Sequence, residues 1–87
     1  MYPSPEMLRA ARSLLGLTQE AAAKACGVSS RTLLAVENGR GTLSGLHSVM
    51  GAYMGKGITF SGSPDYRVQT VSIEHPVPPP PPLIPEA

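Results

Sequence analysis

Residue types that support catalysis or metal binding are few in this chain and lie far apart. His47 and His75 have no further ligands at metal-binding spacing around them. Cys26 is the only cysteine, so no internal disulfide forms, and its core-like position in a predicted helix indicates a small buried hydrophobe. The sequence contains neither a glycine-rich phosphate loop nor a nucleophile elbow. We therefore expect no enzyme activity, no cofactor and no metal site.

Charge is distributed unevenly along the chain, although its net value is only +1 over 87 residues. Up to Gly57 six basic side chains stand against three acidic ones, and beyond it one stands against three. A mildly positive first part suits a partner with a phosphate backbone. The sequence shows no basic-then-apolar leader and no long apolar run, so we expect a cytoplasmic location without membrane contact.

Two short helices joined by a tight turn are predicted between Thr18 and Arg40. Thr18 and Ser29 are suitable N-caps, Gly27 breaks the first helix because glycine readily adopts positive φ, and Asn38-Gly39 ends the second. The small or apolar residues that let these helices cross around one core are Ala22, Ala23, Cys26, Val28, Leu33 and Val36.

One further helix is predicted on each side of this pair. The earlier one begins at Ser4-Pro5-Glu6, has an apolar face of Met7, Leu8, Ala11, Leu14 and Leu15, and ends at Gly16. The later one begins near Thr42 or Ser44, carries Leu46, Val49, Met50, Tyr53 and Met54, and stops at Gly55 and Gly57. The length fits one domain with a modest core, which dimerisation would stabilise.

After Gly57 the chain favours β-structure. Residues 58–60 are β-prone, residues 61–65 suit a turn, and residues 66–74 predict a strand whose imperfect alternation indicates a bulge or burial on both faces. Because a two-stranded ribbon alone is marginal in water, we expect it to pair with the same segment of a second subunit. The residues expected at that dimer contact are Ile58, Phe60, Tyr66, Val68, Val71 and Ile73.

Proline dominates the segment from Pro76 to Pro85, which predicts an extended polyproline II tail. Such a tail is either a stiff solvated end or a docking peptide for a protein partner. The predicted organisation is therefore a helical domain over residues 1–57, a β-strand and dimerisation segment over 58–75, and a disordered Pro-rich tail over 76–87.

The segment Thr18–Arg40 resembles the helix-turn-helix of the Cro/repressor-type (XRE) family. The matching residues are Gln19 opening the first helix, Ala23 at the crossing, Gly27 in the turn, Val28, Leu33 and Val36 in the core, and the ending Glu37-Asn38-Gly39-Arg40. Leu8–Leu17 is similar to the family's first helix, and the resemblance extends from about Pro5 to Phe60. It implies a mainly α fold, a four-helix Cro/repressor-like domain with a short C-terminal strand or hairpin and a Pro-rich tail.

The resemblance also implies a set of site residues. Those expected to contact DNA bases are Ser29, Ser30, Arg31, Leu34, Ala35 and Asn38, and those expected to contact phosphates are Thr18, Gln19, Arg40 and Thr42. Arg31 is the best candidate for direct readout, because a guanidinium pairs with both guanine acceptors. Arg12 and Glu37 are expected to form a structural ion pair that fixes the second helix of the motif.

The function that this resemblance implies is a homodimeric, sequence-specific regulator of transcription that binds double-stranded DNA, most simply as a bacterial or phage repressor. The alternative is a protein-interaction adaptor or antitoxin that uses the helix-turn-helix as a scaffold and its C-terminal segment to bind a partner protein.

Overall fold

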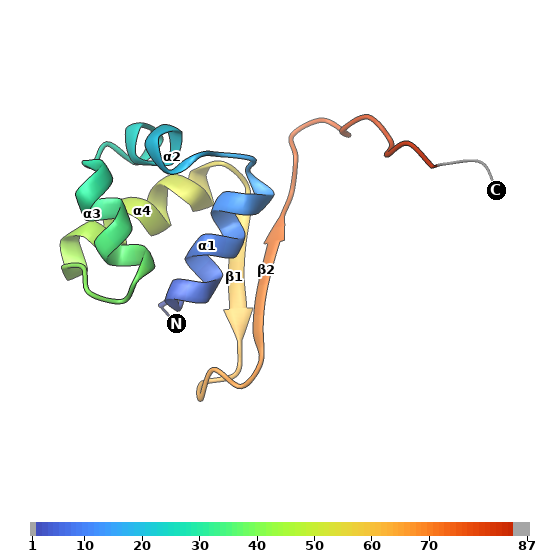
Figure 1. Ribbon diagram of the computed structural model, residues 1–87. Coiled ribbons are helices and arrows are strands. Elements are labelled where there is room, and N and C mark those ends of the chain that lie inside the picture. Colours follow the sequence, from blue (N-terminus) through green and yellow to red (C-terminus); the bar gives the residue numbers. More distant parts are fainter. Residues whose placement is uncertain (1, 85–87) are drawn as a thin grey trace.

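The computed structural model describes residues 2–84, and these form four helices followed by one antiparallel hairpin. In chain order the elements are α1 (Pro5–Leu14), α2 (Gln19–Cys26), α3 (Ser30–Glu37), α4 (Leu43–Gly55), β1 (Ile58–Gly62) and β2 (Gln69–Ile73). Figure 1 shows the helices gathered in one cluster, with the hairpin lying along α1. The mainly α fold with a C-terminal hairpin is the one that the sequence predicts.

Each helix begins at a capping hydroxyl. Ser4, Thr18, Ser29 and Thr42 each accept a hydrogen bond from the backbone N–H three residues further on, at 3.0–3.2 Å. Such a cap satisfies an N–H that the helix itself leaves without a partner, and it contributes about 1 kcal/mol. Gly27 ends α2 in the left-handed conformation with a φ of 68°. The predicted starts of the helices and the predicted turn are therefore confirmed.

Every helix and the first strand contribute to one core. The members of this core are Leu8, Ala11, Ala22, Ala23, Leu33, Val36, Val49, Tyr53 and Ile58. The short side chains of Ala22 and Ala23 let α2 pack closely against both α3 and α4.

Two residues predicted for the core are exposed instead. Leu14 ends α1, and Leu15 packs against the core in its place. Met54 lies in the last turn of α4, beyond the point where Tyr53 and Ile58 close the core. The helical period places both residues on the apolar side, but the core ends before it reaches them.

The hairpin has one apolar and one polar face. Ile58 lies opposite Ile73 and Phe60 opposite Val71, and all four side chains are buried or half-buried on the side of the helices. The outer face carries only exposed hydroxyl side chains, which are those of Thr59, Ser61, Thr70 and Ser72. The alternation within β2 is therefore regular, with neither a bulge nor burial on both faces.

The second strand begins later than predicted, because Tyr66 and Val68 belong to the loop. Tyr66 has a φ of 61°, which no strand residue adopts, and Val68 is exposed. The Asp65 carboxylate accepts hydrogen bonds from the Ser63 hydroxyl at 2.7 Å and from the Arg67 N–H at 3.1 Å. These bonds hold the pKa of Asp65 below its usual value and shape the loop around that carboxylate.

The hairpin packs against the helices of its own chain, so its apolar face is covered without a second subunit. The inner-face residues Ile58, Phe60, Val71 and Ile73 all pack against the core of the same chain. Ile58 is buried and the other three are partly exposed, and the predicted dimer contact stays a prediction. Of the six residues predicted for dimerisation, only Tyr66 and Val68 have exposed side chains.

Beyond β2 the chain leaves the body of the protein. Residues 74–84 contain neither helix nor strand, and Figure 1 shows them extending away from the helices. Leu83 is 99% exposed and Ile84 is 83% exposed. Residues 85–87 of the predicted tail lie outside the described residues. The division into segments 1–57, 58–75 and 76–87 stays a prediction, and Ile58 shares its core with the helices.

Alkaline pH tests the burial of Tyr53. Its side chain is fully buried, and its hydroxyl has no hydrogen-bond partner among the described residues. Burial raises the pKa of Tyr53, so above pH ~10 the unfolded chain loses this proton while the folded chain retains it. The free energy of unfolding must then fall as pH rises, by at most about 1.4 kcal/mol per pH unit from this group.

We expect Tyr53→Phe to reduce this alkaline loss and to raise the free energy of unfolding near pH 7 by about 1 kcal/mol, because the unpaired hydroxyl is gone. Urea unfolding at about pH 7 and about pH 11 measures both effects. Tyr2→Phe, at an exposed tyrosine, is the control. An alkaline loss that is the same in wild type and Tyr53→Phe would contradict the assignment.

Candidate nucleic-acid interface

α2 and α3 are joined by a short turn that begins at Gly27. After Gly27 the backbone N–H of Val28 donates to the Ala23 carbonyl at 3.0 Å, which ties the turn to α2. Leu33 and Val36 point from α3 into the core. The opposite side of α3 is therefore presented to solvent.

Most of the predicted base-contact residues lie on this outer side of α3. Ser30, Arg31, Leu34 and Asn38 have exposed side chains, as does Ser29 just before the helix. Ala35 is only half-buried rather than exposed, because the loop after the helix returns to it and the Arg40 N–H donates to the Ala35 carbonyl at 2.8 Å. We define the outer face of α3 as Ser30, Arg31, Leu34 and Asn38.

Ser29 has a structural task at the start of α3. Its hydroxyl accepts the Thr32 N–H at 3.1 Å and donates to the Thr32 hydroxyl at 3.0 Å. Both its donor and its main acceptor position are thus engaged within the first turn. Ser29 acts as a cap here, and Ser30 is the better candidate of the two for a contact outside the protein.

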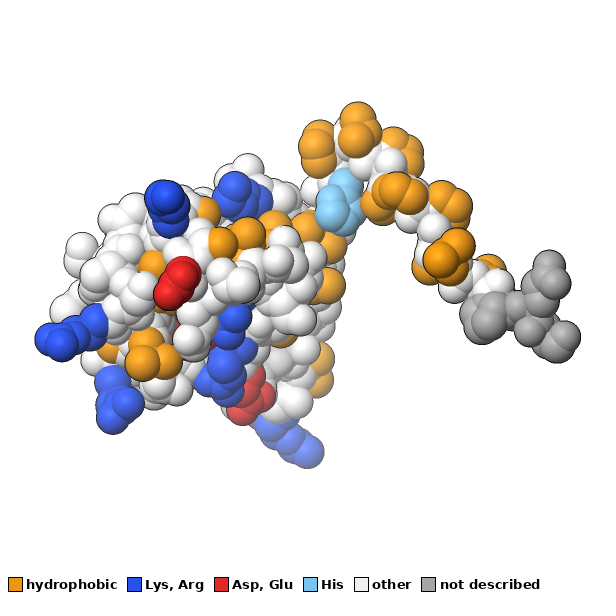
Figure 2. Space-filling model, turned by 45° about the horizontal axis from the view of Figure 1, so that its top comes forward, with side chains coloured by type: hydrophobic (Ala, Val, Ile, Leu, Met, Phe, Trp, Pro, Cys, Tyr) orange, Lys and Arg blue, Asp and Glu red, His pale blue; other side chains and the backbone are white. Residues whose placement is uncertain are grey.

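The predicted phosphate-contact residues lie at three places in the chain, before and after α3. Thr18 and Gln19 begin α2, Thr42 caps α4, and Arg40 lies in the intervening loop, all with exposed side chains. Helix N-termini attract anions, and a threonine that accepts a capping bond retains its own O–H for a phosphate oxygen. Figure 2 shows basic side chains spread over the visible face of the helical body, with fewer acidic ones between them.

A buried ion pair lies behind α3. The Glu37 side chain is 2% exposed, and its two carboxylate oxygens accept hydrogen bonds from Arg12 Nε at 2.8 Å and Arg12 Nη2 at 3.2 Å. Arg12 Nη1 also donates to the Leu17 carbonyl at 3.3 Å. The structure thus contains the predicted contact between Arg12 and Glu37, and its two parallel bonds fix both the position and the rotation of the last turn of α3.

Arg9 belongs to the same arrangement but was missed by the sequence analysis. Its guanidinium donates to the backbone carbonyl of Glu37, so α1 holds both the side chain and the main chain of this residue. The signal in the sequence was the spacing of three between Arg9 and Arg12, which places both on one side of α1.

The two histidines and the cysteine lie on three different segments, none of them α3. The His47 ring stacks on Tyr2, with ring centroids 5.5 Å apart, and His75 lies in the segment after β2. Cys26 is half-buried at the end of α2, where burial raises the pKa of its thiol. Within residues 2–84 no three His, Cys, Asp or Glu side chains gather in an arrangement that could hold a metal ion.

The fold and the outer face of α3 together define a helix-turn-helix protein. The family whose description is "Helix-turn-helix" matches residues 8–47, from the fourth residue of α1 to the fifth residue of α4. The match covers less than half of the chain, and it supports a Cro/repressor-type helix-turn-helix over this segment and a DNA-binding regulator in general. No curated protein matches the chain. Within the described residues, no helix combines the length and the apolar character that crossing a membrane would require.

Removing the buried carboxylate should destabilise the fold strongly. Glu37→Ala leaves Arg12 without its partner, which typically costs about 3–5 kcal/mol. Glu20→Ala, at an exposed position of α2, is the matched control and should change stability by less than about 1 kcal/mol.

Urea unfolding of Glu37→Ala, of Arg12→Ala and of the double variant Arg12→Ala/Glu37→Ala gives the coupling energy between the two side chains. We expect the double variant to lose less than the sum of the two single losses. Strict additivity would mean that the two groups do not interact.

Proposed function

We propose that the protein is a homodimeric, sequence-specific regulator of transcription that acts as a repressor by placing α3 in the major groove of double-stranded DNA. The observation that carries this proposal is the outer face of α3, exposed in front and held from behind by the buried Glu37 carboxylate. A short helix fixed in this way meets base edges without first having to become ordered. A regulator that binds DNA acts in the cytoplasm, at the nucleoid.

Direct readout rests mainly on Arg31. Its guanidinium is exposed in the first turn of α3, the part of a recognition helix that contacts base edges, and it can donate two parallel hydrogen bonds to a guanine. Leu34, which is 47% exposed one turn further on, suits the methyl group of a thymine. Ser30 and Asn38 add hydrogen-bonding groups at the two ends, whereas Ser29 and Ala35 are placed less favourably.

Dimerisation is assigned to the free edge of β2. In the hairpin the Glu74 N–H donates to the Gly57 carbonyl, and the Ser63 N–H donates to the Val68 carbonyl. Because hydrogen-bonded and non-hydrogen-bonded pairs alternate along an antiparallel ladder, the backbone N–H and C=O groups of Gln69, Val71 and Ile73 point away from β1. Antiparallel pairing of β2 with the partner's β2 would satisfy this edge and give a four-stranded sheet. The two recognition helices would then read half-sites about 34 Å apart in a palindrome.

A salt titration tests the DNA contact itself. We expect steep weakening of binding with salt for any duplex, and a preference of about a thousandfold or more for one palindromic site. Arg40→Ala should weaken binding evenly across sequences and lower the slope of log K against log salt by about 1, since Arg40 contacts a phosphate. Absence of binding to every duplex at low salt would overturn the proposal.

Arg31→Ala tests sequence readout. If Arg31 pairs with a guanine, its loss should cost about 1–3 kcal/mol and relax the preference at one position of each half-site. Arg67→Ala, at an exposed arginine of the hairpin loop, is the control and should leave the preference unchanged. Selection from a random duplex pool measures both profiles, and an unaltered profile for Arg31→Ala would remove this residue from the readout.

The adaptor hypothesis depends on the tail rather than on α3, and it stays a separate prediction.

A further inference from the structure

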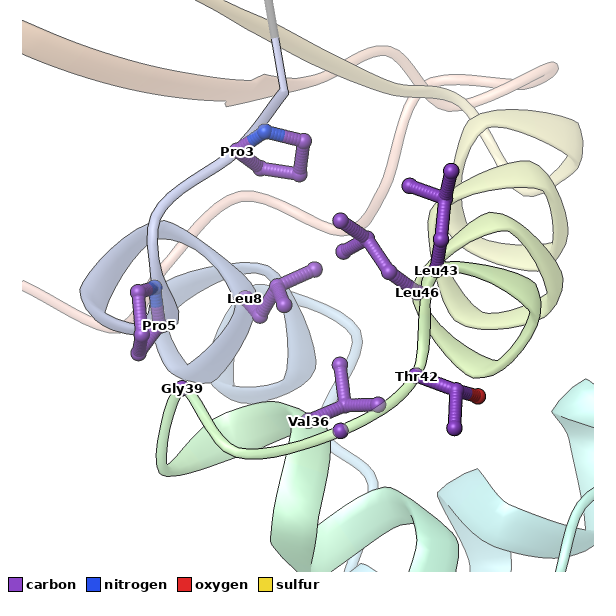
Figure 3. Close-up of a pocket in the computed structure, with 9 residues that line it drawn as sticks. Pro3, Pro5, Leu8, Val36, Gly39, Thr42, Leu43 and Leu46 are labelled. Atoms are coloured by element: carbon purple, nitrogen blue, oxygen red, sulfur yellow. The ribbon is translucent and has the colours of Figure 1, made fainter.

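An apolar groove opens on the surface between the start of α1 and the start of α4. Its volume is about 260 Å³. The main lining side chains are Pro3, Pro5, Leu8, Val36, Leu43 and Leu46, and Figure 3 shows them around a common hollow. We call this the proline-leucine groove.

Two aromatic side chains, which do not themselves line the groove, belong to the chain neighbours of two lining residues. Tyr2 and His47 are the chain neighbours of Pro3 and Leu46, and their rings stack on each other with a hydrogen bond of 3.1 Å between Tyr2 Oη and His47 Nε2. Leu43 is 56% exposed at the rim. The aliphatic walls of the groove suit apolar proline rings and large aliphatic side chains.

The chain itself carries a segment of matching chemistry. Residues 78–82 are five consecutive prolines, followed directly by Leu83 and Ile84, whose side chains make almost no contact with their own chain. Two large aliphatic side chains so fully exposed gain free energy by burial, and the stiff prolines before them lose little conformational entropy on docking.

The tail of one chain starts far from its own groove. The groove lies at the loop end of the hairpin, where Gln69 is tied to α1 through the Ser4 hydroxyl and the Glu6 carboxylate. The tail leaves at the other end, after Ile73, and points away from the helices (Figure 1). To reach its own groove the tail would have to reverse and run back along the whole strand.

Antiparallel pairing of two β2 strands removes this difficulty. The end of one β2 then lies beside the beginning of the partner's β2, which is the end where the partner's groove opens. From residue 74 to residue 83 a polyproline II chain spans roughly 28 Å, at about 3.1 Å per residue. That reach is ample for a groove that begins next to the partner's strand.

We propose that the tail of each subunit docks into the proline-leucine groove of a second copy of this chain, with Leu83 and Ile84 as its anchors, an inference that rests on the homodimer proposed above. The two dockings are reciprocal, so each dimer contains two of them. They add buried apolar surface to a strand contact that is otherwise made by backbone groups alone.

Two full-length variants test the docking. Leu83→Ser/Ile84→Ser removes the anchors, and Leu43→Ser alters the groove at an exposed residue that the fold does not need. Each docking should be worth roughly tenfold in the dimer dissociation constant, so each variant should dimerise roughly 100-fold more weakly than wild type. Met54→Ser, at a residue of the same helix that is 53% exposed outside the groove, is the control and should dimerise like wild type.

Mixing the two variants separates docking between subunits from docking within one chain. The mixed dimer combines an intact tail from one subunit with an intact groove from the other, so it should recover one docking and bind roughly tenfold more tightly than either variant alone. Sedimentation equilibrium with one variant fluorescently labelled measures both constants.

Three results would overturn the inference in different ways. Unchanged dimerisation of both variants would eliminate the docking but leave the strand-paired dimer and its DNA binding intact. Weakened dimers without recovery on mixing would place the tail on its own chain. A wild-type chain that stays monomeric at every concentration would contradict the homodimer itself, and the docking with it.

Discussion

The orientation of α3 depends on one buried carboxylate. α3 has eight residues, too few for a helix to be stable in water by itself, so its position comes from packing and from its ends. Glu37 supplies the fixed end, because Arg12 holds its side chain and Arg9 holds its carbonyl. A charge so deeply buried is tolerated only when it is paired, and the pairing converts α1 into a rigid support. The outer face of α3 is thereby held in one orientation relative to the rest of the domain.

The two ends of the hairpin have different neighbours. At the loop end Gln69 is bonded to the first turn of α1, and the Tyr66 hydroxyl donates to the Tyr2 carbonyl at 2.7 Å. At the other end the Glu74 N–H donates to Gly57, and the tail begins. Ile58, the first residue of β1, inserts into the helical core beside this second end. The β-segment is thus part of the same folded unit as the helices, while its outer edge and its tail stay directed outward.

The loop between α3 and α4 brings the two proposed surfaces together. Gly39 and Thr42 line the proline-leucine groove, and Arg40 between them is the proposed phosphate contact. The loop passes so close to α3 that a Cβ at Gly41 would overlap Val36. A segment docked in the groove would therefore lie against the same loop that is proposed to contact the DNA backbone, so assembly and DNA binding would depend on one short stretch of main chain.

Local sequence determined the helices, since caps and turn residues act within a few positions. The caps bond to backbone N–H groups of their own helices, as Ser4, Thr18 and Ser29 do, and Gly27 ends α2 through its own positive φ angle. The contact between Arg12 and Glu37 was predicted from the family resemblance, because a separation of 25 residues in the sequence does not by itself indicate a contact. Only the tertiary structure decided where the core ends and which face of the hairpin packs on it. The end of the core leaves Leu14 and Met54 exposed. These outcomes depend on how much volume the elements enclose once packed, and no local pattern carries that information.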